Sequence, residues 1–289
     1  ASIAAGGTLG ILIPPSVILV IYGLLTEQSI GKLFMAGFIP GFIGIVFYTL
    51  AVKFVVTRDA TLGPAGERTN WKDRLIALKD VWTTLALFIF VIGGIYIGLF
   101  SATEAAGMGA AGALFITFFK GALNRKVLLV VGREASLLTA KLFSLLFGAS
   151  MFSNFLNRAG LPDALKGIIE SFGLSGLEVI FIILIIYILL GCVFESMSMI
   201  LLTVPIFAPL VQELGFSLIW FGILVVVVTE ISLITPPIGL NVFVLKGVVK
   251  DVSVSTIFKG VTPFWIADII RLILLTSIPA LSLFLPSLM

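Results

Sequence analysis

The residues best suited to chemistry flank two double prolines, each of which interrupts an apolar stretch. Pro14 and Pro15 lie in LGILIPPSVILVIYG, and Pro236 and Pro237 lie in ISLITPPIGLNVFVL. A helix loses backbone hydrogen bonds at such a pair, and bilayer hydrocarbon offers no water to replace them. The freed carbonyls are oxygen ligands of the kind that a hard monovalent cation such as Na⁺ binds. The sequence therefore predicts two helix breaks that are suited to holding an ion.

Polar residues and glycines surround both breaks. Those around the second break are Ser232, Thr235, Gly239 and Asn241. Those around the first break are Gly6, Gly7, Thr8, Gly10 and Ser16. The tip of an expected helical hairpin can close the second break from the opposite direction, with Gly191, Glu195, Ser196 and Ser198. One double proline alone is better explained by kinking or close packing of membrane helices, but the paired occurrence favours ion sites.

The composition places these breaks in an all-α polytopic membrane protein. The chain has 289 residues, of which 60% are hydrophobic and 11% are charged, and it contains no histidine. A single cysteine excludes an intrachain disulfide and a Cys/His metal site, and a net charge of +3 is too small to indicate nucleic-acid binding. Without histidine or a spaced acidic pair, the sequence lacks the acid–base or metal constellation of an enzyme, and we expect no cofactor.

Apolar runs predict seven membrane-crossing segments in three parts of the chain. The segments are 9–25, 36–57, 81–100, 103–120, 140–157, 217–250 and 257–285. Residues 1–57 are expected to form the end of a first repeat, with its broken helix and the helix that follows. Residues 58–80 are expected to form a cytoplasmic connector, since most lysines and arginines fall on the side of this connector. The second repeat, 81–289, is expected to contain scaffold helices 81–120, a hairpin at 177–213, the broken helix 217–250 and the last helix 257–285.

The segment 177–213 is predicted to be a re-entrant hairpin. Its second arm is interrupted by Pro205 and Pro209, and its turn carries Glu195 but no basic residue. A turn that reached the cytoplasm should carry lysine or arginine. A full transmembrane hairpin with a tight turn is the alternative.

Matching spacings indicate an inverted repeat. The double prolines lie 222 residues apart, and Gly37 and Pro40 correspond to Gly260 and Pro263 at an offset of 223. An odd number of crossings separates the helices that follow the breaks, so they should run in opposite directions. Inverted repeats with broken helices are typical of secondary transporters, whose sites lie near the midplane where the breaks face each other. If the first repeat matched the second, a further hairpin would precede Ala1, and we therefore expect this chain to be an N-terminally truncated permease.

Four ionisable residues fall within apolar segments, where charges are costly and usually functional or paired. Asp268 and Arg271 stand three apart on one helix face and are expected to neutralise each other, with an anion contact by Arg271 the lesser option. Glu230 could steady the second break or bind a proton. Glu195 could contact substrate or a cation, or only cap a helix. Outside this group, Glu104 is expected to cap a helix rich in small residues.

Five long strings of the sequence resemble the large membrane subunit of tripartite ATP-independent periplasmic (TRAP) transporters. They are GGTLGILIPPS, IYGLLTEQSIGKLFMAGFIPG, GGIYIGLFSATEAAG, FESMSMILLTVPIF and WFGILVVVVTEISLITPPIGLNVFVLKG. The resemblance implies an elevator-type transporter driven by a Na⁺ gradient. It also implies three partners: a small membrane subunit, a periplasmic substrate-binding protein and a small organic acid anion.

The resemblance also implies which residues bind. One ion would be held by Gly191, Ser232, Thr235 and the Ile238 carbonyl, and the other by Gly7, Thr8, Gly10 and Ser16. Substrate contacts would come from Glu195, Ser196, Ser198 and Asn241, while Pro14, Pro15, Pro236 and Pro237 would break the helices. The sequence departs from the family at Glu195, where aspartate is frequent, and at Ser232, where glycine is frequent.

The resulting hypothesis is sodium-coupled uptake of a C4-dicarboxylate or sialic acid across the bacterial inner membrane. The alternative within transport is an ion-coupled carboxylate permease that needs no binding protein, and the extended order of motifs from SIGKLF to TEAAG favours the tripartite family. A passive pore would need no coupled ion sites. We expect the 289-residue segment alone not to transport.

Overall fold

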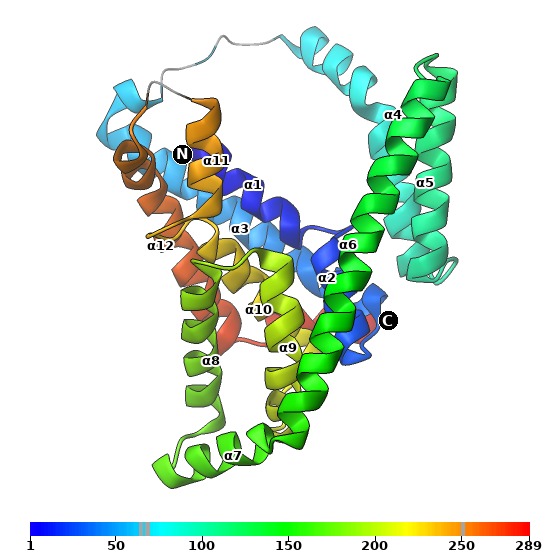
Figure 1. Cartoon of the computed structure of the whole chain (residues 1–289). Coiled ribbons are helices and arrows are strands. Elements are labelled where there is room, and N and C mark those ends of the chain that lie inside the picture. The colour runs from blue at the N-terminus through cyan, green and yellow to red at the C-terminus, as the bar shows by residue number, and fades with distance from the viewer. Residues whose placement is uncertain (64–65, 67–69, 250–251) are drawn as a thin grey trace. The chain divides into compact units, whose positions relative to one another are not determined.

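The computed structural model describes residues 1–63, 66, 70–249 and 252–289, and these contain helices and turns but no strand (Figure 1). The α-helices are α1 (Ser2–Leu12), α2 (Val17–Thr26), α3 (Ile30–Arg58), α4 (Trp71–Tyr96), α5 (Ala102–Phe119), α6 (Arg125–Arg158), α7 (Leu161–Phe172), α8 (Gly176–Gly191), α9 (Ser196–Glu213), α10 (Leu218–Ser232), α11 (Leu240–Val248), α12 (Val254–Ser277) and α13 (Ala280–Leu283). Short 3₁₀ turns η1 and η2 cover Ala60–Leu62 and Pro286–Leu288. In the described part, five helices are long and apolar enough to cross a membrane, or six if both parts of α4 count as one span. The prediction of an all-α polytopic membrane protein is confirmed.

The chain forms two compact units. One comprises Ala1–Leu62 with Leu145–Met289, and the other comprises Gly63–Ser144. Both double prolines and the hairpin of α8 and α9 belong to the first unit.

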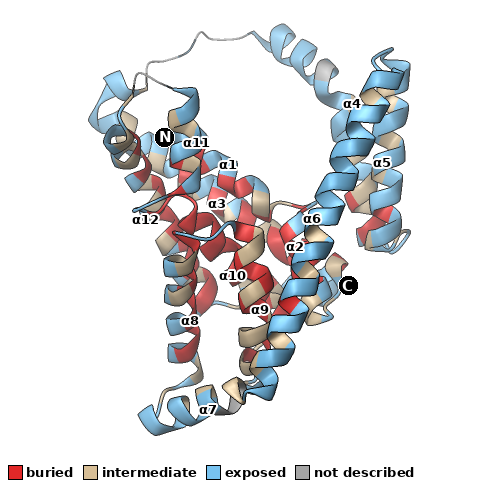
Figure 2. Cartoon of the chain, in the orientation of Figure 1, coloured by how far each residue is buried: buried red, intermediate tan, exposed pale blue. Residues whose placement is uncertain are grey.

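Helix α10 forms the centre of the first unit. Its sequence, LIWFGILVVVVTEIS, is apolar on nearly every face, and all of its residues except Ile219 are buried (Figure 2). Helices α1, α2, α3, α8, α9 and α12 all pack against it. A helix that is apolar all round is expected at such a buried position.

The packing of the two broken helices repeats itself within this unit. Helices α1, α2 and α3 correspond in sequence to α10, α11 and α12. Helix α1 packs on α3 as α10 packs on α12, and α2 on α3 as α11 on α12. Between the repeats, α1 packs on α12 as α10 packs on α3, and α1 on α11 as α10 on α2. The contacts therefore follow an approximate two-fold symmetry.

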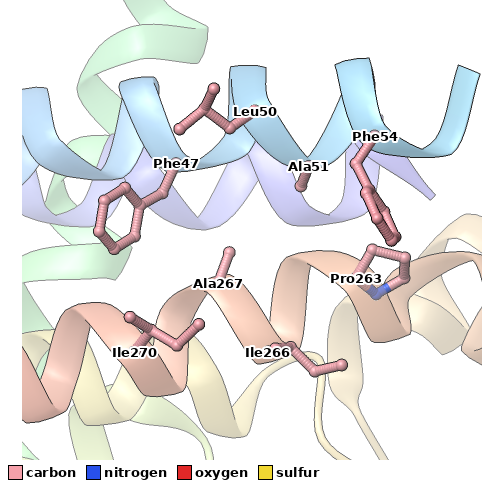
Figure 3. A pocket seen from close by; sticks show the side chains of 8 residues that line it. All are labelled: Phe47, Leu50, Ala51, Phe54, Pro263, Ile266, Ala267 and Ile270. Atoms are coloured by element: carbon pink, nitrogen blue, oxygen red, sulfur yellow. The ribbon is translucent and has the colours of Figure 1, made fainter. Parts of the chain in front are cut away.

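Helices α3 and α12 run antiparallel, as the odd number of crossings predicts. Phe47 lies across from Ile270, whereas Phe54 lies across from Pro263 (Figure 3). These side chains line an apolar groove of about 320 Å³ between the two helices. The repeat is therefore inverted at this pair of helices.

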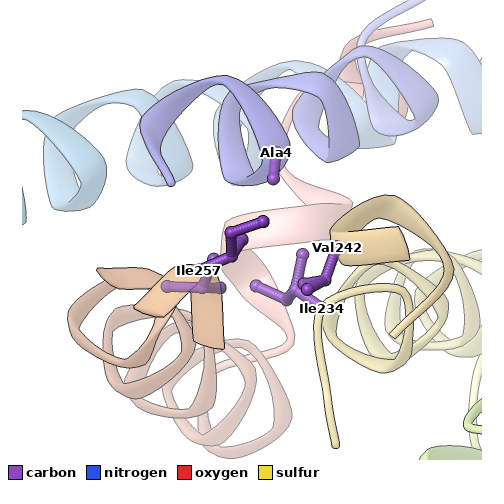
Figure 4. Packing of buried hydrophobic residues seen from close by; sticks show 5 residues of the cluster. Ala4, Ile234, Val242 and Ile257 are labelled. Atoms are coloured by element: carbon purple, nitrogen blue, oxygen red, sulfur yellow. The ribbon is translucent and has the colours of Figure 1, made fainter. Parts of the chain in front are cut away.

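The two broken helices also run antiparallel along their length. The Tyr22 hydroxyl donates to the Leu218 carbonyl, the Leu12 backbone faces the Glu230 carboxyl, and Ala4 packs with Ile234 (Figure 4). The second break thus lies by the start of α1 and the first break just past its end, about 12 Å apart at 1.5 Å per residue. The two breaks thus lie toward opposite ends of α1.

Sequence signals account for several helix ends. The Ser101 hydroxyl and the Glu104 carboxylate form a capping box at α5, which confirms the predicted cap. Glu178 forms the same motif with Ser175 at α8. After α3, hydrogen bonds from Thr61 lower the pKa of the Asp59 carboxyl below its ordinary value.

The second unit is built on the antiparallel hairpin of α4 and α5. Methyl groups added at Gly112 and Gly94 would overlap Leu87 and Phe100, respectively. Small residues here allow close helix packing.

The helices differ from the expected segments at two places. The last helix ends at Ser277 rather than 285, because Pro279 follows closely and starts the separate short helix α13. The expected connector 58–80 becomes helical at Trp71. Residues 64, 65 and 67–69 of the expected connector lie outside the described part. So do residue 250 of the expected broken helix and residue 251 after it.

Candidate ion and charge sites

The second break spans residues 233–239, between the end of α10 and the start of α11. The Asn241 backbone N–H donates to the Leu233 carbonyl at 3.1 Å and so links the two sides of the break. Gly239 caps α11 with a φ of +56°, in the left-handed region that glycine adopts without strain. The two prolines therefore lie in the interruption between the helices, and Gly239 allows the chain to start α11.

Thr235 is held inside this break by two hydrogen bonds. Its hydroxyl donates to the Ile231 carbonyl at 2.6 Å and accepts from Trp265 Nε1 at 2.9 Å. A hydroxyl has two acceptor lone pairs, so one remains for a cation. Trp265, on α12, was not singled out from the sequence, and no spacing rule points to it.

The tip of the α8–α9 hairpin reaches this break. A methyl group added at Gly191 would overlap the Ser232 side chain, and Cys192 Sγ lies 3.4 Å from the Pro236 carbonyl oxygen. The structure therefore places Gly191 against Ser232, and the Thr235 N–H donates to the Ser232 carbonyl. Ile238 lies farther along the break and is 40% exposed.

The predicted substrate contacts have protein partners. Glu195 caps α9, where its carboxylate accepts from the Met197 and Ser198 backbone N–H groups at 3.0 and 3.1 Å. Ser196 is buried beside it. The Asn241 amide donates to the Ala4 carbonyl at 3.2 Å and ties α11 to α1.

A cavity of about 370 Å³ adjoins the second break. Pro236 and Trp265 line it together with Lys259 and the hydroxyl-bearing Ser255 and Thr262. Lysine and hydroxyl groups suit an anionic ligand. Sequence reasoning treated Lys259 only as a marker of orientation.

The residues that were predicted to bind an ion at the first break differ in their exposure. Ser16 caps α2 and accepts from the Leu19 N–H, and Thr8 is buried, with its hydroxyl 2.7 Å from the Ala5 carbonyl oxygen. Gly7 and Gly10 are exposed, and an added methyl group would meet nothing within 4 Å. On α1, Thr8 therefore faces the interior, whereas Gly7 and Gly10 face outward.

A buried charge cluster lies where α1, α3, α10 and α12 meet. The Arg271 guanidinium contacts Asp268 at 3.0 Å, which confirms the expected pair, and it also hydrogen-bonds to Glu230. The Tyr48 hydroxyl donates to Asp268 and lies 3.3 Å from the Thr8 hydroxyl. The contact of Arg271 with Glu230 was missed, since the two residues are far apart in sequence. Within the described residues, no group of three or more His, Cys, Asp or Glu side chains is arranged to hold a metal ion.

The chain is similar to a family of known membrane proteins over nearly its full length. Residues 1–281 match the family described as "Tripartite ATP-independent periplasmic transporter, DctM component". The C4-dicarboxylate TRAP transporter large permease protein DctM of Pseudomonas aeruginosa is 36% identical over 287 residues, which cover 97% of this chain and 65% of that relative.

Relatives that are named for other substrates are similar to a comparable degree. The sialic acid TRAP transporter large permease protein SiaM of Vibrio cholerae is 31% identical, with 99% of this chain and 66% of that relative covered. The ectoine TRAP transporter large permease protein TeaC of Halomonas elongata is 31% identical, with 95% of this chain and 64% of that relative covered. The chain thus spans about two thirds of the length of these relatives. The match of the family model to residues 1–281, together with these identities, shows that the chain belongs to the DctM component family of tripartite ATP-independent periplasmic transporters.

Proposed function

We propose that the protein acts in sodium-coupled secondary uptake of a small organic acid across the bacterial inner membrane. The observation that carries this proposal is the meeting of the hairpin tip with the second break. Gly191 and Cys192 contact Ser232 and Pro236 there, next to the Thr235 hydroxyl. A broken helix that is closed by a hairpin tip gathers oxygen ligands where transporters bind coupling ions.

One Na⁺ would bind at this junction through the Thr235 hydroxyl and backbone carbonyls of Gly191, Ser232 and Ile238. The Ser232 hydroxyl donates to the Thr229 carbonyl at 2.7 Å, so its carbonyl is the better ligand. A second Na⁺ would bind at the first break, near Ser16, with Gly7 and Gly10 leaving the α1 backbone accessible. Thr8 would contribute from the interior side.

The substrate would be a small organic acid anion of the C4-dicarboxylate or sialic acid type. The relatives' names include both classes. Ser196, Ser198 and Glu195 at the hairpin tip and Asn241 at the start of α11 are the proposed contacts. A periplasmic binding protein would deliver the substrate, and a small membrane subunit would complete the transporter.

The α8–α9 hairpin would be re-entrant and would move in an elevator-type cycle. Helix α8 has 16 residues and is therefore about 24 Å long, which is shorter than the roughly 30 Å of bilayer hydrocarbon. A tip that ends inside the protein can lie against the break.

Substitution of Thr235 by alanine tests the sodium site. It removes one proposed ligand, so we expect the apparent Na⁺ affinity of uptake to fall about tenfold, equivalent to ~1.4 kcal/mol. The measurement is substrate uptake against Na⁺ concentration by the permease in proteoliposomes with its partner proteins.

Thr276→Ala is the matched control. Thr276 is also buried, and its hydroxyl also donates to a carbonyl within its own helix, that of Leu272 at 2.8 Å. It should leave Na⁺ affinity unchanged. If the Thr235→Ala protein shows the same Na⁺ dependence as the wild-type protein, this ion site is rejected. If uptake by the wild-type protein does not depend on Na⁺, sodium coupling itself is rejected.

A further inference from the structure

The buried charge cluster obeys the same symmetry as the double prolines. Glu230 lies 222 residues after Thr8, and Arg271 lies 223 residues after Tyr48, which are the two offsets of the repeat. The structure pairs Glu230 with Arg271 in one repeat and Thr8 with Tyr48 in the other. A charged pair and a neutral pair thus occupy equivalent places, and Asp268 joins them by contacting both Tyr48 and Arg271.

The charges in this cluster do not balance when every group is ionised. One guanidinium faces two carboxyl groups, and the side chains of Glu230, Asp268 and Arg271 are each at most 1% exposed. Both carboxyl groups contact the same guanidinium nitrogen, Nη2. Burial of an uncompensated charge costs several kcal/mol, which uptake of one proton removes.

The hydrogen bonds distinguish the two carboxyl groups. Asp268 accepts from the Tyr48 hydroxyl and faces Arg271, so each of its oxygens has a positively polarised neighbour. Glu230 Oε2 accepts from Arg271, and Glu230 Oε1 and Asp268 Oδ1 are both buried without a hydrogen-bond partner among the described residues, but Oδ1 lies 3.0 Å from Arg271 Nη2, whereas no ion pair with the guanidinium reaches Oε1. The Asp268 carboxylate is thus the better stabilised anion.

We propose that Glu230 is a proton-binding site that holds a proton at neutral pH, while Asp268 stays ionised against Arg271. The cluster is then electrically neutral inside the protein. The proton comes from solvent and no covalent bond other than O–H forms. This site does not depend on sodium coupling at the breaks.

Other ionisable groups on the elements around α10 lie elsewhere. Tyr22 on α2 and Tyr187 on α8 pack near Phe221, nine residues and therefore roughly 13 Å from Glu230 along the helix. The described ionisable groups that act on Glu230 or its direct partners are therefore Arg271, Asp268 and Tyr48, and the neutral groups beside them are the Leu12 backbone N–H, which faces the Glu230 carboxyl, and the Thr8 hydroxyl.

Isotope-edited infrared spectroscopy of the purified protein tests this proposal. At about pH 7, exposed carboxyl groups are ionised, so a protonated-carboxyl C=O band marks a buried acid. We expect such a band to shift when glutamate carries ¹³C at its carboxyl carbon and not when aspartate does. We also expect its loss in Glu230→Gln, and in Asp268→Asn as well, because Glu230 would then be the one carboxyl group left to balance the charge of Arg271 and would ionise.

The labelling experiment needs no substitution, so it remains decisive if a variant fails to fold. Absence of a glutamate-sensitive band in the wild-type protein would overturn the proposal. So would a band that shifts with labelled aspartate only, or one that persists in Glu230→Gln. Thermal unfolding adds a second comparison: Glu230→Gln should keep the wild-type Tm, whereas Asp268→Asn should lower it because it removes the anion that faces Arg271.

Discussion

At the scale of single residues, Arg271 depends on a neighbour that has no side chain. Arg271 reaches from α12 past α3 to Glu230 on α10, and Gly44 lines its path. A methyl group at Gly44 would overlap Arg271 Nη1 and lie 2.6 Å from Leu9 Cδ2. The glycine is therefore a spatial requirement of the buried ion pair.

Gly44→Ala should consequently destabilise the protein. Overpacking in a core costs about 1–3 kcal/mol, and displacement of one partner of a buried ion pair costs about 3–5 kcal/mol. We expect a clear fall in Tm, measured by thermal unfolding in detergent. Gly6→Ala is the control, because an added methyl group there meets nothing within 4 Å; equal Tm values for the two variants would contradict the packing argument.

The sequence predicts half of this cluster. Asp268 and Arg271 stand three apart, so their pairing follows from helix geometry. Glu230 contacts Arg271 only because two helices pack, and no local spacing reports that. The offset between the repeats was the one available signal. It aligns Glu230 with Thr8 and Arg271 with Tyr48, so it places the two residues of each pair at equivalent positions.

At the scale of helices, the hairpin and the second break fit by close approach of α8 to α10. Both breaks and both hairpin arms were predictable, because proline and glycine act on the local backbone. The end of α12 was not, since the apolar sequence continues beyond Pro279 and hydrophobicity alone does not mark a helix end. The direction of the Thr8 side chain was not predictable either, because its position next to Gly7 says nothing about the face of α1 on which that side chain lies.

Gly191→Ala tests the fit between α8 and α10. The new methyl group would overlap Ser232, so we expect a loss of about 1–3 kcal/mol in stability. The same substitution in a Ser232→Gly background should cost less, because the overlapping atoms are gone. The measurement is a double-mutant cycle on the free energy of unfolding.

Gly167→Ala serves as the control for this cycle, since it lies in open space on α7. Additive effects of Gly191→Ala and Ser232→Gly on the free energy of unfolding would show that the two side-chain positions do not interact.

At the scale of the whole chain, α3 is long enough for its two ends to lie on opposite sides of the membrane. It has 29 residues and is about 43 Å long, which exceeds the roughly 30 Å of hydrocarbon. Lysines and arginines cluster after its C-terminal end, and we therefore expect that end to lie in the cytoplasm.

Cysteine labelling tests this orientation. In a Cys192→Ser background, we expect Lys32→Cys to react with a membrane-impermeant maleimide in intact spheroplasts. Ala60→Cys should react only after the membrane is opened. Both positions are exposed, so access to the reagent is not limited by packing. The reverse labelling pattern would invert the proposed topology.

The unequal pairs at the centre of the inverted repeat bear on stoichiometry. Two equivalent carboxyl groups would titrate as coupled sites, and each would shift the other. Here the place equivalent to Glu230 is occupied by Thr8, which does not ionise. With the acid kept in one repeat and replaced by Thr8 in the other, this cluster would take up a single proton, in one step.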